Sequence, residues 1–242
     1  MLIRSGAAAA RTEICMKPVF KPCMDALPLA QQRLWPSLNN AAKLGFVLYG
    51  VTAIALRLGH RQSVDFDFFS DRPLDREAIR SAFSFVDHST TLHDQENSWT
   101  LLVPDNEAEE TQSVKVSFFG PIGFGRVGNP DVTDDRVLQV ASFNDLMATK
   151  VKVILQRAEA KDYRDIAAMI NAGVSLSCGL AAARLMFGAN FQPGESLKAL
   201  VYFDDGDLQS LTSAEKRTLV NAAKSVRDLP MTMLLSTQLT AD

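Results

Sequence analysis

The sequence predicts an α/β protein of the α+β kind, with a mixed α/β half over about residues 25–140 followed by a helical half. In the first half, short strand-like apolar segments alternate with helix-like segments, which indicates a mixed sheet with helices packed on it. From Ser142 onward the apolar residues recur with a period of 3.6, which is typical of amphipathic helices. Hydrophobic residues make up 47% of the 242 residues and charged residues 22%, so the chain can bury a sizeable core.

Composition also limits the classes of function. The formal net charge is -3, so the overall charge does not attract nucleic acid, although a local basic face remains possible. Three cysteines without a Cys-x-x-Cys pair argue against a disulfide framework or a zinc site and favour the cytoplasm. The longest apolar run, 44–56, is too short to cross a bilayer. We therefore expect a cytoplasmic protein without a membrane partner.

Glycines and prolines divide the first half into its elements. The first 24 residues look poorly structured, and a helix over 25–43 is expected to break or kink at Pro36. The segments that follow alternate or are amphipathic, which predicts strands at 45–50, 63–70, 98–104 and 113–120 and helices at 51–59 and 75–83. The segment 120–135 holds four glycines and two prolines and is expected to be a loop.

The second half is predicted to be a series of helices. Residues 142–173 indicate two helices that meet near Ala160, with Ser142 as the N-terminal cap of the first. Further helices are expected over 178–191 and 212–226, the latter opened by a capping box of Thr212 and Glu215. The expected organisation is an N-terminal segment 1–24, an α/β core 25–140, and a helical region 141–242 that completes a cleft.

Two carboxylates stand out in the strand predicted at 63–70. Asp65 and Asp67 are two residues apart, so they project from the same face of the strand, while Val64, Phe66 and Phe68 project from the other. Two carboxylates placed side by side repel each other unless a cation or several donors lie between them. The pair is either a solvated acidic face or a set of ligands for Mg²⁺ (or Mn²⁺), which prefers hard oxygen donors.

The residues just before this strand favour the second interpretation. Gly50 ends the preceding strand and Thr52 opens the next helix. Backbone N–H groups at that helix start are expected to form an anion site, and Gly50 lets the backbone approach a phosphate. A phosphate cradle one helix before a metal-binding strand suits phosphoryl or nucleotidyl transfer.

The segment GVTAIALRLGHRQSVDFDFFS resembles the signature of the AbiEii/AbiGii-type nucleotidyltransferase toxin family, a branch of the DNA polymerase β-like nucleotidyltransferase fold. The residues that match are Gly50, Thr52, His60, Arg61, Ser63, Asp65 and Asp67. The later segment ATKVKVILQRAEAKDYRDI resembles the second signature of the family, with Lys150, Arg157, Asp162 and Asp165 in place. The resemblance covers roughly residues 40–170 and implies a polymerase β-like nucleotidyltransferase core.

Helical spacing supports the second motif independently. Leu146, Lys150, Ile154 and Arg157 share one helix face, and the apolar residues on it turn Lys150 towards the protein body. Lys150 either snorkels to the surface or faces the cleft, where it would hold a nucleotide phosphate. Arg157 with Asp162 and Asp165 is expected to form an ion-pair cluster that braces two helices against the sheet, with Asp162 as a possible site residue.

Three candidate residues lie where the helix at 51–59 connects to the aspartate strand. His60 either donates to a local carbonyl or belongs to the site. Arg61 is placed to reach a triphosphate or to brace Asp65, and the sequence leaves both open. Ser63 is expected to support the strand entry or the phosphate.

The chain departs from the pattern at the place of a third carboxylate, which polymerase β-like transferases commonly carry on a later strand. In the strand at 113–120, Lys115, Ser117 and Phe119 share a face, and Ser117 occupies the expected carboxylate position. A serine can neither bridge two metals nor accept a proton well at neutral pH. The enzyme works with two carboxylates, or Asp87 or another acid replaces the third, or the chain binds a nucleotide without transferring it. Lys115 adds positive charge that suits substrate binding.

The leading hypothesis is a Mg²⁺-dependent nucleotidyltransferase that moves a nucleoside monophosphate from an NTP to an acceptor. Asp65 and Asp67 hold the metal, Lys150 and Arg61 neutralise charge, and Gly50 and Thr52 cradle phosphate. The resemblance implies the toxin of a toxin–antitoxin or abortive-infection pair, with an RNA (tRNA-like) or protein acceptor and an antitoxin partner. The alternative is a catalytically weak nucleotide-binding or protein-interaction module.

Overall fold

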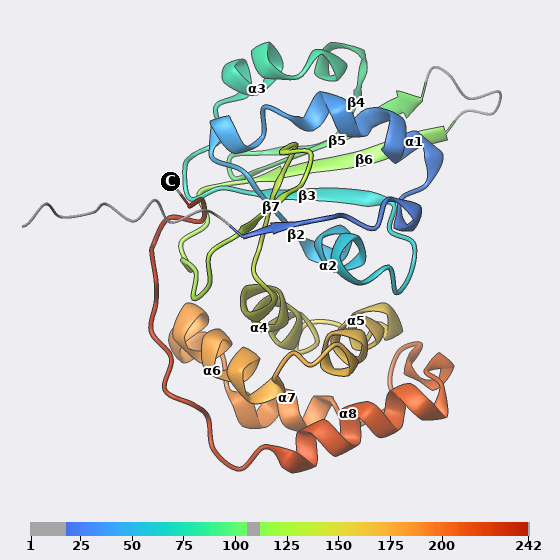
Figure 1. Ribbon diagram of the computed structural model, residues 1–242, viewed down its shortest axis with the longest axis vertical. Helices are drawn as coiled ribbons and strands as arrows, with labels where there is room; N and C mark the ends of the chain where they lie inside the picture. Colours follow the sequence, from blue (N-terminus) through green and yellow to red (C-terminus); the bar gives the residue numbers. More distant parts are fainter. Residues whose placement is uncertain (1–17, 106–111, 242) are drawn as a thin grey trace, which may run out of the picture.

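The computed structural model describes residues 18–105 and 112–241, which form a mixed sheet flanked by helices and followed by a layer of helices (Figure 1). Eight strands lie in the order β1-β7-β8-β2-β3-β6-β5-β4. The strands are β1 (Val19–Phe20), β2 (Val47–Tyr49), β3 (Asp65–Phe69), β4 (Thr90–Gln95), β5 (Ser98–Asp105), β6 (Gln112–Phe119), β7 (Asp131–Thr133) and β8 (Gln139–Val140). The predicted fold class, a mixed α/β half followed by a helical part, is confirmed.

The helices follow the same division. The α-helices are α1 (Leu29–Leu34), α2 (Gly50–Leu58), α3 (Arg76–Ala82), α4 (Phe143–Val153), α5 (Ala160–Asn171), α6 (Leu176–Phe187), α7 (Pro193–Ala199) and α8 (Ser213–Ser225). The described ranges also contain the 3₁₀ helices η1 (Met24–Ala26), η2 (Trp35–Leu38), η3 (Ala42–Leu44), η4 (Ser84–His88), η5 (Gly188–Asn190) and η6 (Leu208–Ser210). The break predicted at Pro36 is confirmed, since α1 ends at Leu34 and continues as a 3₁₀ turn.

The central strands fix the position of the candidate site. β3 and β6 are parallel, with Asp65 beside Lys115, Asp67 beside Ser117, and Phe69 beside Phe119. β5 is antiparallel to β6 and places Thr100 beside Ser117. The alternate residues Phe66, Phe68 and Phe118 are fully buried on the opposite face, where they form the aromatic part of the core. The alternation in the sequence therefore predicted the two faces of β3 correctly. Val64, which was expected on the face of Phe66 and Phe68, precedes the strand and is exposed, and it lines the same cavity as the aspartates.

Helix α2 lies between the sheet and the helical layer. In Figure 1, α1 and α3 cover one side of the sheet, α2 lies on the other side, and α4 and α5 follow beneath it. The predicted caps at Ser142 and at Thr212 with Glu215 are confirmed, because each side chain accepts the backbone N–H three residues later. No helix in the described ranges is long and apolar enough to cross a bilayer.

Several elements were not predicted. All six residues of β4 are exposed, so this edge strand lacks the apolar alternation that marks a strand. β7 lies within the segment expected to be a loop, and α7 within the helical half had no predicted counterpart. Of the N-terminal segment expected to be poorly structured, residues 1–17 lie outside the described ranges, and Val19–Phe20 form β1, which pairs with β7.

The chain after α8 is not helical, in contrast to the prediction for 141–242. It runs back to the sheet (Figure 1), where Leu239 is fully buried. The Arg126 side chain donates to the carbonyl oxygens of Gln238 and Thr240, at 3.0 and 3.3 Å. A further bond joins the Leu239 N–H to the carboxylate of Asp71 at 3.0 Å. This segment therefore ties the helical layer to the core.

Candidate functional site

A polar cavity of about 500 Å³ lies over the face of β3 and β6 that carries Asp65 and Asp67. This volume lies within the range of small-molecule sites. Its lining comes from β3, β5, β6, the segment before β3, the start of α2 and the connection into α5. The lining residues are Val51, Arg61, Gln62, Ser63, Val64, Asp65, Asp67, Phe69, Thr100, Lys115, Ser117, Phe119, Arg157 and Lys161. Two carboxylates and four basic side chains thus meet in one cavity.

The two aspartates carry charge that the protein does not fully neutralise. Asp65 pairs with Lys115, whose Nζ lies 2.7 Å from Oδ2. The pKa of Asp67 is raised above its ordinary value, first by burial and then by the negative charge of Asp65, although several cations act in the opposite direction. A raised carboxyl pKa means that the charged form is not fully compensated, so a cation bound between the two groups would be stabilised.

The donor set fits a divalent metal held by two carboxylates. Asp65 and Asp67 share a face, and both line the cavity. Across the described parts of the chain, no cluster of three or more His, Cys, Asp or Glu side chains could hold a metal ion. Carboxylate oxygens from the protein, completed by substrate phosphate and water, are the usual environment of Mg²⁺. The structure therefore fits a metal bound jointly by this pair and a substrate.

Gly50 has a different role from the predicted phosphate cradle. It lies at φ +71° as the first residue of α2, and a β-carbon there would lie 2.6 Å from Oδ2 of Asp67. Neither Gly50 nor Thr52 lines the cavity, which meets α2 through Val51. The absent side chain of Gly50 therefore makes room for the Asp67 carboxylate itself.

Thr52 supports the strand entry from below the cavity. It is only 1% exposed, and its Oγ1 lies 2.6 Å from Oγ of Ser63 and also donates to the carbonyl oxygen of Asp65. Ser63 is buried as well, and its N–H donates to the carbonyl of Ala26 at 3.1 Å. This chain of hydrogen bonds fixes the backbone on which Asp65 begins β3.

Asp165 is the centre of an ion-pair network that the sequence did not place in the site. Its side chain is fully buried and is contacted by three side chains. Nε2 of His60 and Nε of Arg61 each lie 2.8 Å from Oδ1, and Nζ of Lys150 lies 2.7 Å from Oδ2. Burial acts to raise the pKa of Asp165, but the His60 hydrogen bond and the charges of Lys150 and Arg61 outweigh it and lower the pKa. His60 therefore bonds a distant carboxylate and not a local carbonyl.

Asp162 forms the second half of the network. Nζ of Lys150 lies 2.7 Å from Oδ1, and Nε of Arg157 lies 2.8 Å from Oδ2. Although burial acts to raise the pKa of Asp162, the hydrogen bond from Arg157 and the charge of Lys150 lower it. Arg157 also lines the cavity, so the predicted ion-pair cluster forms a wall of the site and not only a brace behind it.

Two of the predicted site residues, Lys150 and Arg61, pair with buried carboxylates that the sequence did not assign to them. Lys150 is 5% exposed and bonds Asp162 and Asp165, and it does not line the cavity. Lys150 therefore lies behind the cavity wall and not at the cavity surface, where a phosphate ligand was expected. Arg61 lines the cavity but pairs with Asp165 and not with Asp65, since its Nη2 lies 3.1 Å from Oδ2 of Asp165. Arg61, Arg157 and Lys161 supply positive charge to the cavity wall.

Ser117 occupies the position expected for a third carboxylate. It lies directly beside Asp67 in the β3–β6 register, and its Oγ accepts a hydrogen bond from Oγ1 of Thr100 at 3.3 Å. Asp87, considered as a substitute acid, lies on η4 with a largely exposed side chain, 3.7 Å from Arg80, and does not line the cavity. The described cavity lining therefore contains two carboxylates and three hydroxyls, those of Ser63, Thr100 and Ser117.

Sequence reasoning missed several lining residues. Lys161 pairs with Glu159 at 2.6 Å and reaches the cavity from the first turn of α5. The aromatic side chains of Phe69 and Phe119 contact each other edge to face, with ring centroids 5.2 Å apart, at the end of the cavity away from Lys115. The sequence placed Phe119 on the face of Lys115 and Ser117 without assigning it to the site, and the same-face spacing from Asp67 to Phe69 could have indicated this apolar end. No sequence signal points to Lys161.

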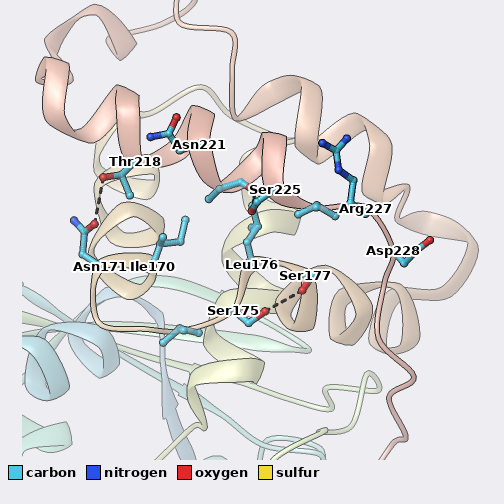
Figure 2. Close-up of a pocket in the computed structure, with 13 residues that line it drawn as sticks. Ile170, Asn171, Ser175, Leu176, Ser177, Thr218, Asn221, Ser225, Arg227 and Asp228 are labelled. Atoms are coloured by element: carbon cyan, nitrogen blue, oxygen red, sulfur yellow. Dashed lines mark hydrogen bonds between the residues drawn. The ribbon is translucent and has the colours of Figure 1, made fainter.

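A larger cavity of about 670 Å³ lies in the helical layer, between the end of α5, the start of α6 and α8 (Figure 2). Its lining is mostly neutral, with Arg227 and Asp228 as its charged residues. The bonds drawn in Figure 2 join lining residues to each other: Thr218 to Asn171 at 3.2 Å and Ser175 to Ser177 at 2.9 Å. This cavity lacks a pair of carboxylates like the one in the cavity over the sheet. The cavity over the sheet is therefore the better candidate for a catalytic site.

Comparison with solved structures places the fold among nucleotidyltransferases. MenT4, a nucleotidyltransferase toxin of Mycobacterium tuberculosis, superimposes with a TM-score of 0.51 at 15% identity, over 81% of this chain and 88% of that one. JHP933 of Helicobacter pylori superimposes with a TM-score of 0.55 at 17% identity, over 83% of this chain and 90% of that one. At these identities the likeness concerns the fold.

Sequence comparisons extend the likeness. An uncharacterized protein of Aquifex aeolicus is 29% identical over 136 residues, which is 54% of this chain and spans 62% of the length of that relative. The family described as nucleotidyl transferase AbiEii toxin, type IV TA system, matches residues 37–224. That range includes the paired aspartates, the ion-pair network and most of the helical layer. This chain belongs to the AbiEii family of nucleotidyl transferase toxins.

Proposed function

We propose that this chain is a metal-dependent nucleotidyltransferase that moves a nucleoside monophosphate from an NTP to an acceptor hydroxyl and releases pyrophosphate. The observation that carries the proposal is the pairing of Asp65 and Asp67 on one face of β3, over a cavity that is also lined by Arg61, Arg157 and Lys161. A carboxylate pair and several basic groups that line one cavity suit a metal-bound triphosphate.

In this proposal each group has a distinct part. Asp65 and Asp67 hold Mg²⁺ or Mn²⁺, which when bound neutralises charge on the phosphate oxygens. Arg61, Arg157 and Lys161 bind the triphosphate, and the acceptor hydroxyl attacks the α-phosphorus. The bond from that phosphorus to the bridging oxygen breaks, the hydroxyl proton passes to solvent, and pyrophosphate leaves. Lys150 is a positioning residue, because it holds Asp162 and Asp165 and through them Arg157 and Arg61.

The family suggests a biological setting for this reaction. We propose that the chain is the toxin of a type IV toxin–antitoxin pair and acts in the cytoplasm on an RNA, tRNA-like, or on a protein. MenT4 is itself described as a nucleotidyltransferase toxin, which supports the toxin role. The antitoxin would be encoded as the partner of the pair.

The test is transfer of label from each α-³²P-labelled NTP, with Mg²⁺, to total RNA or to a protein extract. Asp67→Asn keeps the shape of the side chain and removes one metal ligand, and Asp87→Asn removes an exposed carboxylate outside the cavity. We expect label to move with the native chain and with Asp87→Asn but not with Asp67→Asn. Equal labelling by native chain and Asp67→Asn would contradict the proposal.

A second candidate function follows from Ser117, which leaves the site without a third carboxylate. In that case the chain binds an NTP and does not transfer it. Thermal unfolding with each NTP and Mg²⁺ distinguishes the two: a raised midpoint without label transfer would favour the binding module. Transfer that is lost in Asp67→Asn would exclude it.

A further inference from the structure

We propose that Lys115 is a built-in cation of this site, so that Asp65 and Asp67 bind a single divalent cation whose affinity Lys115 limits. The inference rests on the proposed function, because it concerns how the same pair of carboxylates holds its metal. It assigns to a lysine of β6 the positive charge that a second metal ion would otherwise supply beside the substrate.

The position of Lys115 is set by the sheet and not by a flexible loop. Lys115 lies directly beside Asp65 in the parallel register of β3 and β6, and its Nζ is 2.7 Å from Oδ2 of Asp65. The two side chains are 40% and 35% exposed, and both line the cavity. One of the four carboxylate oxygens of the pair is therefore already engaged by an ammonium group.

Lys115 is the cation that contacts the aspartate pair directly. The other basic residues of the site have different carboxylate partners: Arg61 pairs with Asp165, Arg157 with Asp162, and Lys161 with Glu159. Lys150 is buried between Asp162 and Asp165. Among the described residues, an ion pair to Asp65 or Asp67 is recorded for Lys115 alone.

The residue beside Asp67 explains why one cation suffices. Ser117 lies where a third carboxylate would bridge two metals, and a neutral hydroxyl adds no charge to hold a second one. Two carboxylates and one ammonium group together carry a net charge of about −1, and this charge attracts a divalent cation. A second divalent ion would find no uncompensated carboxylate left to bind, and Lys115 supplies positive charge in its place.

The experiment is a titration with Mn²⁺ alone, followed by the loss of the electron paramagnetic resonance signal of free Mn²⁺. Lys115→Met keeps the length of the side chain and removes its charge. Lys161→Met is the matched control, since it removes the same charge from the same cavity but from a lysine paired with Glu159. Thermal unfolding of each variant verifies that it folds. The Mn²⁺ whose binding is lost in Asp67→Ala is the ion bound at the aspartate pair.

We expect one Mn²⁺ per native chain, absent in Asp67→Ala. Because a half-exposed ion pair is lost, Lys115→Met should bind Mn²⁺ about fivefold more tightly, whereas Lys161→Met should stay within about twofold of the native chain. Two Mn²⁺ ions per native chain, or equal affinity in the native chain and Lys115→Met, would overturn this inference and leave the proposed function standing. A native chain that binds no Mn²⁺ at Asp67 would overturn both.

Discussion

A β-carbon on Gly50 would lie 2.6 Å from Oδ2 of Asp67, so the start of α2 and this cavity-facing carboxylate of β3 fit together only through a glycine. The positive φ of +71° at Gly50 adds a conformation that other residues adopt at a cost. The glycine that opens the first sequence motif is thus explained by the aspartate near the end of the same motif, seventeen residues later.

Gly50→Ala should therefore weaken the metal site as well as the fold. We expect a loss of about 1–3 kcal/mol in unfolding free energy from backbone strain, and weaker Mn²⁺ binding because the Asp67 carboxylate must move. Gly45→Ala is the control, since Gly45 also has a positive φ of +84° but its β-carbon would meet Arg72 at 3.4 Å. Gly45→Ala should lose stability and keep Mn²⁺ affinity. Equal Mn²⁺ affinity in both variants would contradict this explanation of Gly50.

Lys150→Met should destabilise the protein strongly. Removal of one partner from a buried ion-pair network leaves Asp162 and Asp165 undercompensated, which costs about 3–5 kcal/mol. Lys152→Met is the matched change on the same helix, where the ammonium group donates to the carbonyl of Asn190 at an exposed position. We expect urea unfolding to show a loss below about 1 kcal/mol for Lys152→Met. Similar losses in the two variants would argue against the network.

The stability of the protein should fall in acid, and Asp165 should account for a measurable part of the fall. Its pKa in the folded state lies below the ordinary carboxyl value of about 3.9. A carboxyl group with a lowered pKa in the folded state contributes stability that is fully present above its ordinary pKa. This stability is lost as the pH falls from the ordinary pKa towards the folded-state pKa. The difference in unfolding free energy between the native chain and Asp165→Asn should therefore shrink below about pH 4. A difference that is constant from pH 7 to pH 3 would contradict the assignment.

Asp67 should show the opposite shift. Burial and the charge of Asp65 raise its pKa, so protons compete with metal at a higher pH than for an ordinary carboxyl group. Mn²⁺ affinity should accordingly fall with decreasing pH before a free aspartate would titrate. A carbon-13 NMR titration of the Asp67 carboxyl group without metal checks the cause directly: in Asp65→Asn the pKa of Asp67 should decrease. An unchanged pKa in Asp65→Asn would contradict the electrostatic part of the account.

Local patterns in the sequence predicted the part of the site that one strand can specify. Alternation placed Asp65 and Asp67 on one face of their strand, and it placed Lys115 and Ser117 on one face of theirs. That the two strands are neighbours, with Lys115 beside Asp65 and Ser117 beside Asp67, is given by the register and not by alternation. Caps at Ser142 and Thr212 were also correct because a cap depends on residues three positions apart.

The remaining parts depend on contacts between distant residues. Two of the three partners of Asp165, His60 and Arg61, lie more than one hundred residues earlier, so spacing along the chain could not assign them. Thr52 was expected to face a phosphate, but its side chain is buried and its hydroxyl bonds Ser63 and the backbone of Asp65. The C-terminal segment packs on Arg126 through hydrogen bonds to backbone carbonyl oxygens. Such bonds leave no periodic pattern in the sequence.

The most direct test of the central claim is the ratio of pyrophosphate released to nucleotide incorporated. Purified chain is incubated with Mg²⁺, α-³²P-labelled NTP and the acceptor fraction that takes up label, and both products are quantified. The account predicts one pyrophosphate for each labelled nucleotide in the native chain, and neither product in Asp67→Asn. Release of inorganic phosphate without incorporation, or products that persist in Asp67→Asn, would contradict nucleotidyl transfer at the paired aspartates.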